Sequence, residues 1–333
     1  MAVPTNTRET FGAVGIREDL SNIIYNISPM DTPFISGCGR GSCDNTQFEW
    51  QTDELKQVAA NRQIEGNDYT STAATEPRRL SNYTQISATQ VQTSGTAEAV
   101  DFAGRKSSQA YQLAKRAKEM KRDMEFMLLE GTVKSAGSSG SARNTAAFST
   151  WIGTNDGDTS PVIAASTGAG LTNNGSSGYP DGTTEAGTGG ADTAITLAMI
   201  NTCVARIWDL GGSPDTILCK SDVKQTISSS SVGGSVVADL YKDVGSSDKP
   251  ATAVNAVDVL VTDFGTFKVV PDRFLPAGQV DIIDFDLWSI DYLRPFRTET
   301  LAKSGDSVKQ LLIAEYGLRA KNGNGSGQLK SAI

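Results

Sequence analysis

One pairing in the sequence is typical of nucleophilic catalysis, namely Ser221 and Lys224 in the order S-x-x-K. Penicillin-recognising enzymes combine this pair with S-D-N and K-T-G segments, and neither segment occurs in these 333 residues. The chain also contains no histidine, which removes the commonest general base and every Ser-His or Cys-His nucleophile pair. We therefore interpret Ser221 as the N-cap of a helix and expect no catalytic residue.

Four aspartates gather in one short region and could suggest a site for a hard cation. They are Asp281, Asp284, Asp286 and Asp291. The alternation along residues 279–293 predicts a strand whose apolar side chains share one face, while Asp284 and Asp286 share the other. Arg294 and Arg297 follow closely and can act as countercharges, so we expect no metal site.

Cys38 and Cys43 stand five positions apart in the glycine-rich stretch DTPFISGCGRGSC, residues 31–43. A zinc site needs about four ligands, and no histidine is present to supply any of them. Cys203 and Cys219 fall in an expected helix and an expected strand, where thiols pack as small apolar groups. We interpret the first pair as part of a turn, with neither metal nor disulfide. Phosphate-binding glycine motifs are also missing from the sequence, so we expect no cofactor.

The charge and the N-terminus limit the function further. A formal net charge of -8 argues against a protein whose whole surface binds nucleic acid. The opening MAVPTNTRETFGAV lacks the basic and apolar regions of a signal peptide, and no stretch reaches the roughly 18 apolar residues of a membrane helix. We therefore expect synthesis in a reducing cytoplasm, with free thiols and no membrane partner.

Two segments in the first third of the chain have little core of their own. The first, REDLSNIIYNI at 17–27, carries one apolar face of a short amphipathic helix. The second consists of two β-prone runs, 45–55 and 81–94, joined by a long polar stretch. We expect an N-terminal arm over 1–44 and an extended hairpin loop over 45–94. Neither can bury its surface within a compact monomer, so both would lie across neighbouring copies.

The apolar period becomes helical over residues 100–131, which predicts a long straight helix of about 29 residues and roughly 43 Å. Its apolar stripe consists of Ala110, Leu113, Ala117, Met120, Met124 and Met127. Its basic face consists of Lys115, Arg116, Lys118, Lys121 and Arg122, and this face either is solvated or touches nucleic acid. Gly131 is expected to end the helix in the left-handed conformation.

Beyond this helix the composition changes twice. Residues 135–193 are rich in Gly, Ser, Thr, Asn and Ala, which predicts a surface insertion at about 153–190. A mixed region follows, with a helix at 191–212 whose inward residues would be Ile195, Met199, Val204 and Trp208. Further strands are expected at 215–220, 257–274, 279–293 and 308–320, and the glycine-rich tail is expected to lead to a sheet edge. The fold class is therefore α+β.

In this order the segments resemble the tailed-bacteriophage major capsid proteins of the Hong Kong 97-like fold, in a branch seen in short-tailed and related phages. Five stretches spanning nearly the whole chain carry the resemblance: REDLSNIIYNISPMDTPFIS (17–36), FEWQTDEL (48–55), GGSPDTILCKSDVK (211–224), FGTFKVVPDRFLP (264–276) and LRPFRTETLAKSGDSVKQLLIAEYGLRAKN (293–322).

The resemblance implies a peripheral domain at 95–150 built on a spine helix at 100–131, an axial domain at 151–290, and a return to the peripheral domain at 291–333 with the C-terminal strand and tail. It implies a structural subunit of the virion that assembles as hexamers and pentamers into an icosahedral shell around double-stranded DNA. The implied partners are other copies of the chain, a scaffolding protein, a portal protein, a decoration protein and the packaged DNA, bound non-specifically.

The arm and the loop would supply the contacts between subunits. The expected contact residues are Leu20, Ile23, Ile24, Ile27, Arg62, Glu65, Glu76, Arg78 and Arg79. One alternative is another phage assembly protein, such as a decoration or tail-tube subunit, which would not need the long helix. The other alternative is a histidine-free hydrolase that uses Ser221 and Lys224.

Overall fold

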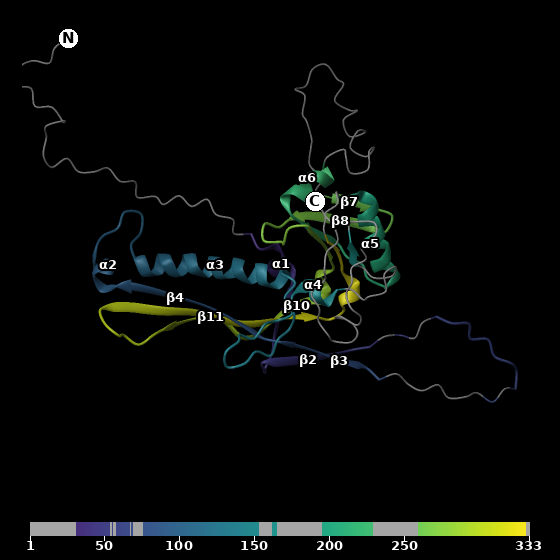
Figure 1. Ribbon diagram of the computed structural model, residues 1–333, viewed down its shortest axis with the longest axis horizontal. Coiled ribbons are helices and arrows are strands. Elements are labelled where there is room, and N and C mark those ends of the chain that lie inside the picture. Colours follow the sequence, from purple (N-terminus) through teal and green to yellow (C-terminus); the bar gives the residue numbers. More distant parts are fainter. Residues whose placement is uncertain are drawn as a thin grey trace, which may run out of the picture.

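The computed structural model describes residues 31–152 apart from positions 54, 56–57, 67 and 69–75, together with residues 162–164, 195–228 and 259–330. In this part of the chain the strands form sheets of four, six and two strands (Figure 1). The predicted arm contacts Leu20, Ile23, Ile24 and Ile27 lie outside the described residues, as does most of the glycine-rich stretch.

The four-stranded sheet has one long helix on one of its faces. Its strands, in spatial order, are β1 (Gly39–Ser42), β10 (Trp288–Thr300), β11 (Ser307–Ala320) and β4 (Gln85–Ser94). β1 runs parallel to β10, whereas the other neighbours are antiparallel. Helix α3 (Ser108–Leu129) packs on the sheet, where Met120 contacts Leu312 and Ala314 in a buried cluster. The C-terminal strand predicted at 308–320 is therefore confirmed.

The helix is shorter at both ends than the predicted range of 100–131. A short helix, α2 (Gly95–Ala99), comes first, and Gly104 turns the chain with a φ of 78°. The side chain of Ser107 then caps α3 by accepting a hydrogen bond from the Ala110 N–H. The chain leaves α3 extended at Glu130, so Gly131 does not provide the left-handed cap that was predicted. The 22 residues of α3 span about 33 Å.

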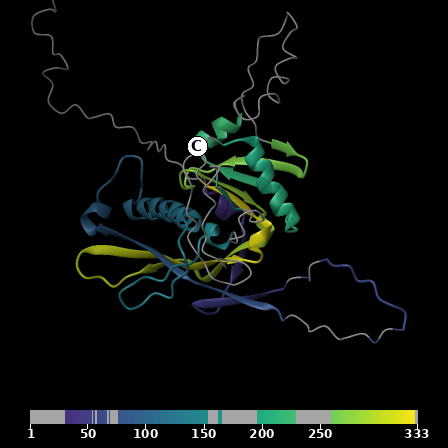
Figure 2. The same ribbon diagram turned by 45° about the vertical axis from the view of Figure 1, so that its right-hand side comes forward.

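The predicted hairpin is present, but its second strand is shorter than the run 81–94. β2 (Gln47–Thr52) pairs antiparallel with β3 (Arg78–Tyr83), and residues 58–66, within the connection between them, project away from the rest of the molecule (Figure 2). Buried Thr84 breaks the run, and its N–H donates to the Thr46 carbonyl. The residues after Thr84 form β4 and join the four-stranded sheet.

The six-stranded sheet is built from five segments of the second half of the chain and the short β5. Its spatial order is β5 (Val162–Ala164), β12 (Gly327–Lys330), β9 (Gln279–Ile283), β6 (Thr216–Cys219), β8 (Gly265–Pro271) and β7 (Val259–Thr262). Helices α5 (Leu197–Asp209) and α6 (Ser221–Ser228) contribute Val204 and Val223 to its core. Ile207 is also buried there, whereas Trp208 is 59% exposed, so the prediction that Trp208 points inward was wrong.

Two strand predictions near the C-terminus need correction. The stretch 279–293 is two strands in different sheets, because a 3-10 turn at Phe285–Leu287, capped by the Asp284 side chain, separates β9 from β10. The tail does not lead to an edge. β12 lies between β5 and β9, and its Leu329 is fully buried.

An aromatic cluster joins the two large sheets. Phe34 from α1 (Pro33–Gly37) contacts Phe148 from α4 (Phe148–Trp151), and the Phe148 and Trp288 ring centroids lie 4.6 Å apart. Leu128 of α3 and Leu218 of the six-stranded sheet belong to the same buried cluster. Among the described helices, none is both long and apolar enough to cross a membrane.

Candidate assembly surfaces

The geometry around Ser221 and Lys224 does not support a catalytic pair. Ser221 is exposed and is the first residue of α6, so the N-cap position falls on Lys220 and the prediction that Ser221 is the N-cap was wrong by one position. The Lys224 amine donates a hydrogen bond to the Val269 carbonyl at 3.0 Å. These contacts are structural: the lysine is bonded to a backbone carbonyl, and the serine lies exposed at the start of a helix.

The fold separates the four aspartates between positions 281 and 291, for which no metal site was expected. Asp281 is fully buried and accepts hydrogen bonds from the side-chain amides of Gln279 and Gln328, at 2.9 and 2.7 Å. Burial raises the pKa of Asp281 to about 7. Asp291 pairs with Arg319, which is a different countercharge from the two arginines expected from the sequence. Within the described ranges, no group of three or more potential metal ligands comes together.

The four cysteines are free and buried, in keeping with the expected thiols. Cys38 and Cys43 flank strand β1, so the segment between them is a strand and not the turn that was predicted. Burial raises the pKa of Cys43 to about 11, which disfavours the reactive thiolate at neutral pH.

A buried carboxyl on α3 anchors α1, which lies within the predicted N-terminal arm. Both oxygens of Glu125 on α3 accept hydrogen bonds from α1, one from the Phe34 N–H at 2.7 Å and one from the Ile35 N–H at 2.8 Å. These N–H groups belong to the first turn of α1, where they have no partner within the helix. Burial is the main cause that raises the pKa of Glu125 to about 8. The sequence gives only a weak signal for this contact, because Glu125 is an acidic residue that follows Met124 of the apolar stripe.

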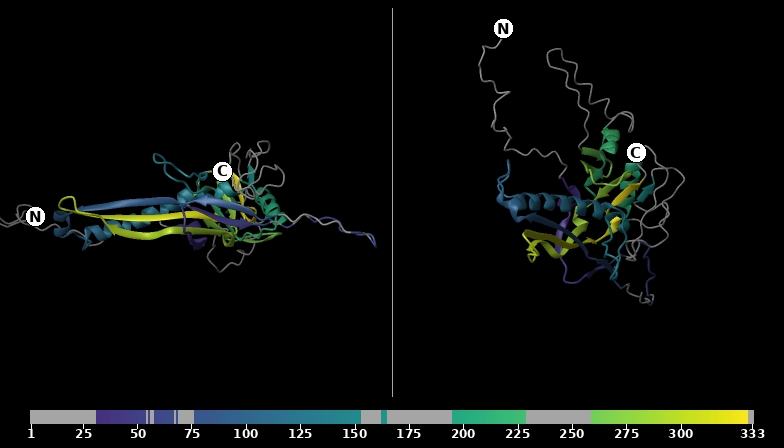
Figure 3. Two further views of the ribbon diagram at one scale, coloured as in Figure 1. Left: turned by 90° about the horizontal axis from the view of Figure 1, so that it is seen from below. Right: turned by 60° about the vertical axis from the view of Figure 1, so that its left-hand side comes forward.

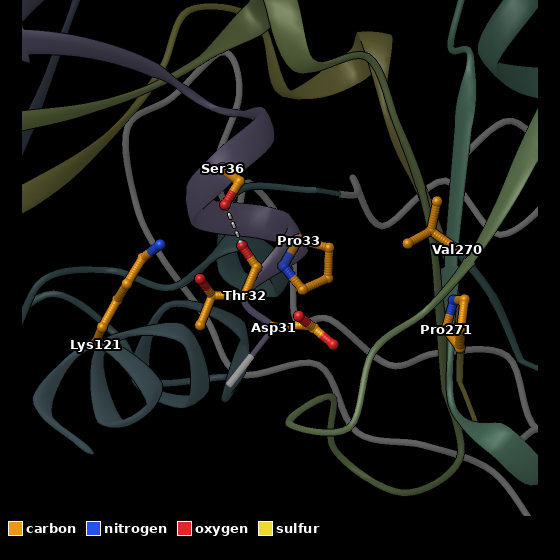
Figure 4. Close-up of a pocket in the computed structure, with 7 residues that line it drawn as sticks. All are labelled: Asp31, Thr32, Pro33, Ser36, Lys121, Val270 and Pro271. Carbon is orange, nitrogen blue, oxygen red and sulfur yellow. Dashed lines mark hydrogen bonds between the residues drawn. The ribbon is translucent and has the colours of Figure 1, made fainter. Parts of the chain in front are cut away.

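A cavity of about 460 Å³ lies beside this anchor (Figure 4). Its lining residues are Asp31, Thr32, Pro33, Ser36, Lys121, Val270 and Pro271. The Ser36 hydroxyl donates to the Thr32 carbonyl at 2.7 Å, which closes the first turn of α1. Residues from the segment 31–36, from α3 and from the end of β8 therefore meet at this cavity.

The base of the hairpin is fixed by buried polar contacts. The Asn82 amide of β3 donates to the Leu318 carbonyl at 2.6 Å, and its oxygen accepts from the Ala146 N–H at 3.0 Å. Glu315 of β11 accepts a hydrogen bond from the Thr84 hydroxyl and forms ion pairs with Arg143 and Arg294, with N–O distances of 2.5 and 2.7 Å. Because Asn82 and Glu315 are both buried, the hairpin leaves the subunit in one direction.

The far part of the hairpin exposes apolar side chains. Leu55, Val58 and Ile64 are 98%, 103% and 78% exposed. The charged residues predicted as contacts, Arg62, Glu65, Glu76 and Arg78, are exposed along the same hairpin, whereas Arg79 also pairs with Glu49 of β2 at 3.4 Å. This combination of apolar and charged exposed groups is typical of a surface that a partner covers.

Solved structures with the same arrangement of elements define the class of fold. The capsid asymmetric unit of cyanophage A-1(L) matches with a TM-score of 0.69 at 13% identity, over 95% of this chain and 97% of that chain. The capsid of an empty GTA particle matches with a TM-score of 0.60 at 13% identity, over 96% of both chains. The predicted α+β fold of the Hong Kong 97-like phage capsid proteins is thereby confirmed.

Comparison of the sequence identifies the family within this class of fold. Residues 3–332 match the SU10 major capsid protein family, so the chain belongs to that family of structural capsid proteins. The major capsid protein of Escherichia phage Phieco32 is 29% identical over 341 aligned positions, which cover 96% of this chain and 95% of that protein. The predicted class, a tailed-phage major capsid protein, is confirmed, and the family match speaks against a decoration subunit, a tail-tube subunit or a hydrolase.

Proposed function

We propose that the chain self-assembles as hexamers and pentamers into an icosahedral head that encloses double-stranded DNA. The projecting hairpin is the observation that carries the proposal. Its base is locked by Asn82 and Glu315, yet Leu55, Val58 and Ile64 farther along are exposed to solvent. Apolar groups held away from their own core are stabilised when a neighbouring subunit covers them.

The two large sheets correspond to the two domains that capsid assembly needs in this proposal. The four-stranded sheet with α3 forms the peripheral domain, and the six-stranded sheet with α5 and α6 forms the axial domain, which faces the centre of each ring. Strand β12 supports one change to the expected boundary, because residues 327–330 pair within the six-stranded sheet. The arm was expected over 1–44 and the loop over 45–94, but β1 and β4 pair within the four-stranded sheet. In this proposal the arm therefore covers residues 1–38 and the loop residues 45–84.

Contacts between subunits in this proposal come from both extensions. The arm contributes the apolar face of Leu20, Ile23, Ile24 and Ile27, and the loop contributes Arg62, Glu65, Glu76, Arg78 and Arg79. A scaffolding protein, a portal protein and a decoration protein are the other proposed partners, and the assembled protein belongs to the virion after synthesis in the host cytoplasm. The exposed basic groups on α3, which include Lys115 and Lys118, are available for non-specific contact with packaged DNA.

Negative-stain electron microscopy with light scattering on the same sample tests the proposal. We expect closed shells, or rings of five and six, from the purified chain or from the chain expressed with the phage's scaffolding protein. Removing residues 57–75, which lie beyond the paired strands of the hairpin, should leave a folded subunit that forms no stable shells. Normal shells from this deletion variant would contradict the assignment of the loop. A uniform monomer in the presence of the scaffolding protein would contradict the assembly itself.

A further inference from the structure

The two long edges of the four-stranded sheet are built in opposite ways. β4 forms one edge over its whole length, and the part of β10 beyond β1 forms the other (Figure 3). Free strand edges are templates for pairing with another chain, so proteins usually guard them with charges, proline or bulges. Comparing the two edges therefore shows which one is kept available.

The β10 edge has all three features that hinder strand pairing, namely charges, a proline and bulges. Its exposed segment carries Arg294, Pro295, Arg297 and Glu299, and its register with β11 shifts twice, between Tyr292 and Arg297. Proline removes a backbone donor, charges oppose burial, and each register shift bends the strand away from a flat partner. This edge is unsuited to pairing with another strand.

The β4 edge has none of these guards. Its sequence QISATQVQTS contains no charged residue and no proline. All ten of its residues pair with β11 in one unbroken register, from Gln85 opposite Tyr316 to Ser94 opposite Ser307. Within the described part of the chain its other side has no strand partner. A regular, uncharged edge of this length is ready to accept a strand.

A groove follows this edge and leaves room beside it. The groove has a volume of about 320 Å³ and runs between β4 and α3. Residues 86–89 of β4 line one side, and Arg116, Glu119, Met120 and Asp123 of α3 line the other. A second strand can therefore reach the backbone of β4, and both positively and negatively charged side chains line the groove.

We propose that β4 pairs antiparallel with β4 of a second copy of this chain, so that two four-stranded sheets become one sheet of eight strands. The proposal rests on the assembly proposed above and adds a two-fold contact to it. A strand with no charge can face itself without like-charge repulsion. The groove carries both signs of charge as well, because Arg116 stands beside Glu119 and Asp123, so a second copy meets no field of a single sign there.

The hydrogen-bonding pattern restricts the register of this contact. In an antiparallel pair, the residues whose N–H and C=O point outward alternate along each strand. Two identical strands can therefore pair only with a residue on the two-fold axis. Near the middle of β4 this residue is Gln90 or Thr89, and either choice pairs nine residues of each copy.

Disulfide trapping in assembled shells gives a direct test, because the four native cysteines are buried. Directly opposed residues have Cα atoms about 4.5–5.5 Å apart, within the range that a disulfide spans. We expect Gln90→Cys to give a covalent dimer on mild oxidation if Gln90 lies on the axis. If Thr89 lies there, a mixed sample of Ala88→Cys and Gln90→Cys should give the dimer. Thr298→Cys, on the guarded edge, is the matched control and should stay monomeric on a denaturing gel.

The outcomes separate this contact from shell assembly in general. Shells that form without any of these dimers would overturn the β4 pairing and leave the proposed function intact. A disulfide between Gln90→Cys and Arg62→Cys of another copy would also overturn it, because the hairpin would then occupy the edge. Absence of shells from the wild-type chain expressed with the scaffolding protein would instead count against the proposed function. Gln90→Lys combined with Gln92→Lys should reduce the yield of shells at least tenfold, whereas Thr298→Lys should not.

Discussion

Replacing Glu125 by glutamine perturbs the contact between the long helix and the start of the arm without changing the size of the side chain. In the native protein both carboxyl oxygens accept backbone N–H groups of α1. A glutamine has one oxygen, so its amide group would face one of the two donors. We expect a loss of about 1–3 kcal/mol in the free energy of unfolding under acidic conditions, which is the cost of one unpaired buried donor.

The pH dependence of this effect follows from the surroundings of Glu125. Burial is the largest cause of the raised pKa, Asp272 adds to it, and the two backbone hydrogen bonds and Lys121 oppose it. Burial also raises the pKa of Asp272. Because the folded pKa of Glu125 is about 8 and its ordinary value is 4.5, folding takes up a proton between these values. The stabilisation is complete below the lower value and is lost as the pH rises through the upper one.

Each pH unit inside this window corresponds to about 1.4 kcal/mol. The native subunit should therefore lose roughly 3–5 kcal/mol of unfolding free energy between about pH 5 and pH 8 through this one group. Glutamine does not titrate, so the variant should lack this part of the slope. The stability curves of the two proteins should approach each other, or cross, as the pH rises.

Urea titrations of the unassembled subunit at several pH values would measure this difference. The matched control is Glu119→Gln, because Glu119 lies on the same helix but forms an ion pair with the exposed Arg116. The control should keep the native slope and shift stability by less than about 1 kcal/mol. Parallel curves for the native protein and Glu125→Gln would refute the reasoning, since the buried carboxyl would then not be the group that takes up the proton.

Three further perturbations test the hairpin. Gly317→Ala places a methyl group against the Phe48 ring, so thermal and urea unfolding should show a loss of about 1–3 kcal/mol in the free energy of unfolding. The control is Gly140→Ala, where the added Cβ meets no other atom, and its free energy of unfolding should stay within about 0.5 kcal/mol of the native value. Glu315→Gln weakens two ion pairs at the hairpin base and should cost about 1–3 kcal/mol by urea titration, and an unchanged midpoint would contradict the anchoring role. Shell yield should fall at 1 M salt, where the Debye length is about 3 Å, if Arg62 forms ion pairs between subunits, and a constant yield would argue against such pairs.

Local periodicity predicted the elements that depend on their own residues. The apolar stripe of the long helix and the alternation of the C-terminal strand are repeated over many positions, so both elements were found. The N-terminal end of the helix was missed because the turn at Gly104 and the cap at Ser107 delay its start, inside a stretch that lacks proline. Single-residue signals of this kind are weaker than a repeated pattern.

The missed features depend on contacts that are distant in the sequence. Thr84 and the turn at Phe285–Leu287 each divide a continuous β-prone run, because the two halves join different sheets. Periodicity is the same on both sides of such a break and cannot reveal it. The role of Glu125 was likewise hidden, since its partners lie 90 and 91 positions away.

The fixed base of the hairpin has a consequence for the cost of assembly. Ordering a segment on binding loses conformational entropy, and this loss weakens the contact. Asn82 is buried and bonded to Leu318 of β11 and to Ala146, and buried Glu315 of β11 accepts a hydrogen bond from Thr84, so the direction of β2 and β3 is set within the single subunit. Glu125 likewise holds the first turn of α1 within the single subunit. A subunit whose extensions are directed before contact loses less entropy when a neighbour covers them, so exposed apolar groups on these extensions contribute more of their burial energy to the shell.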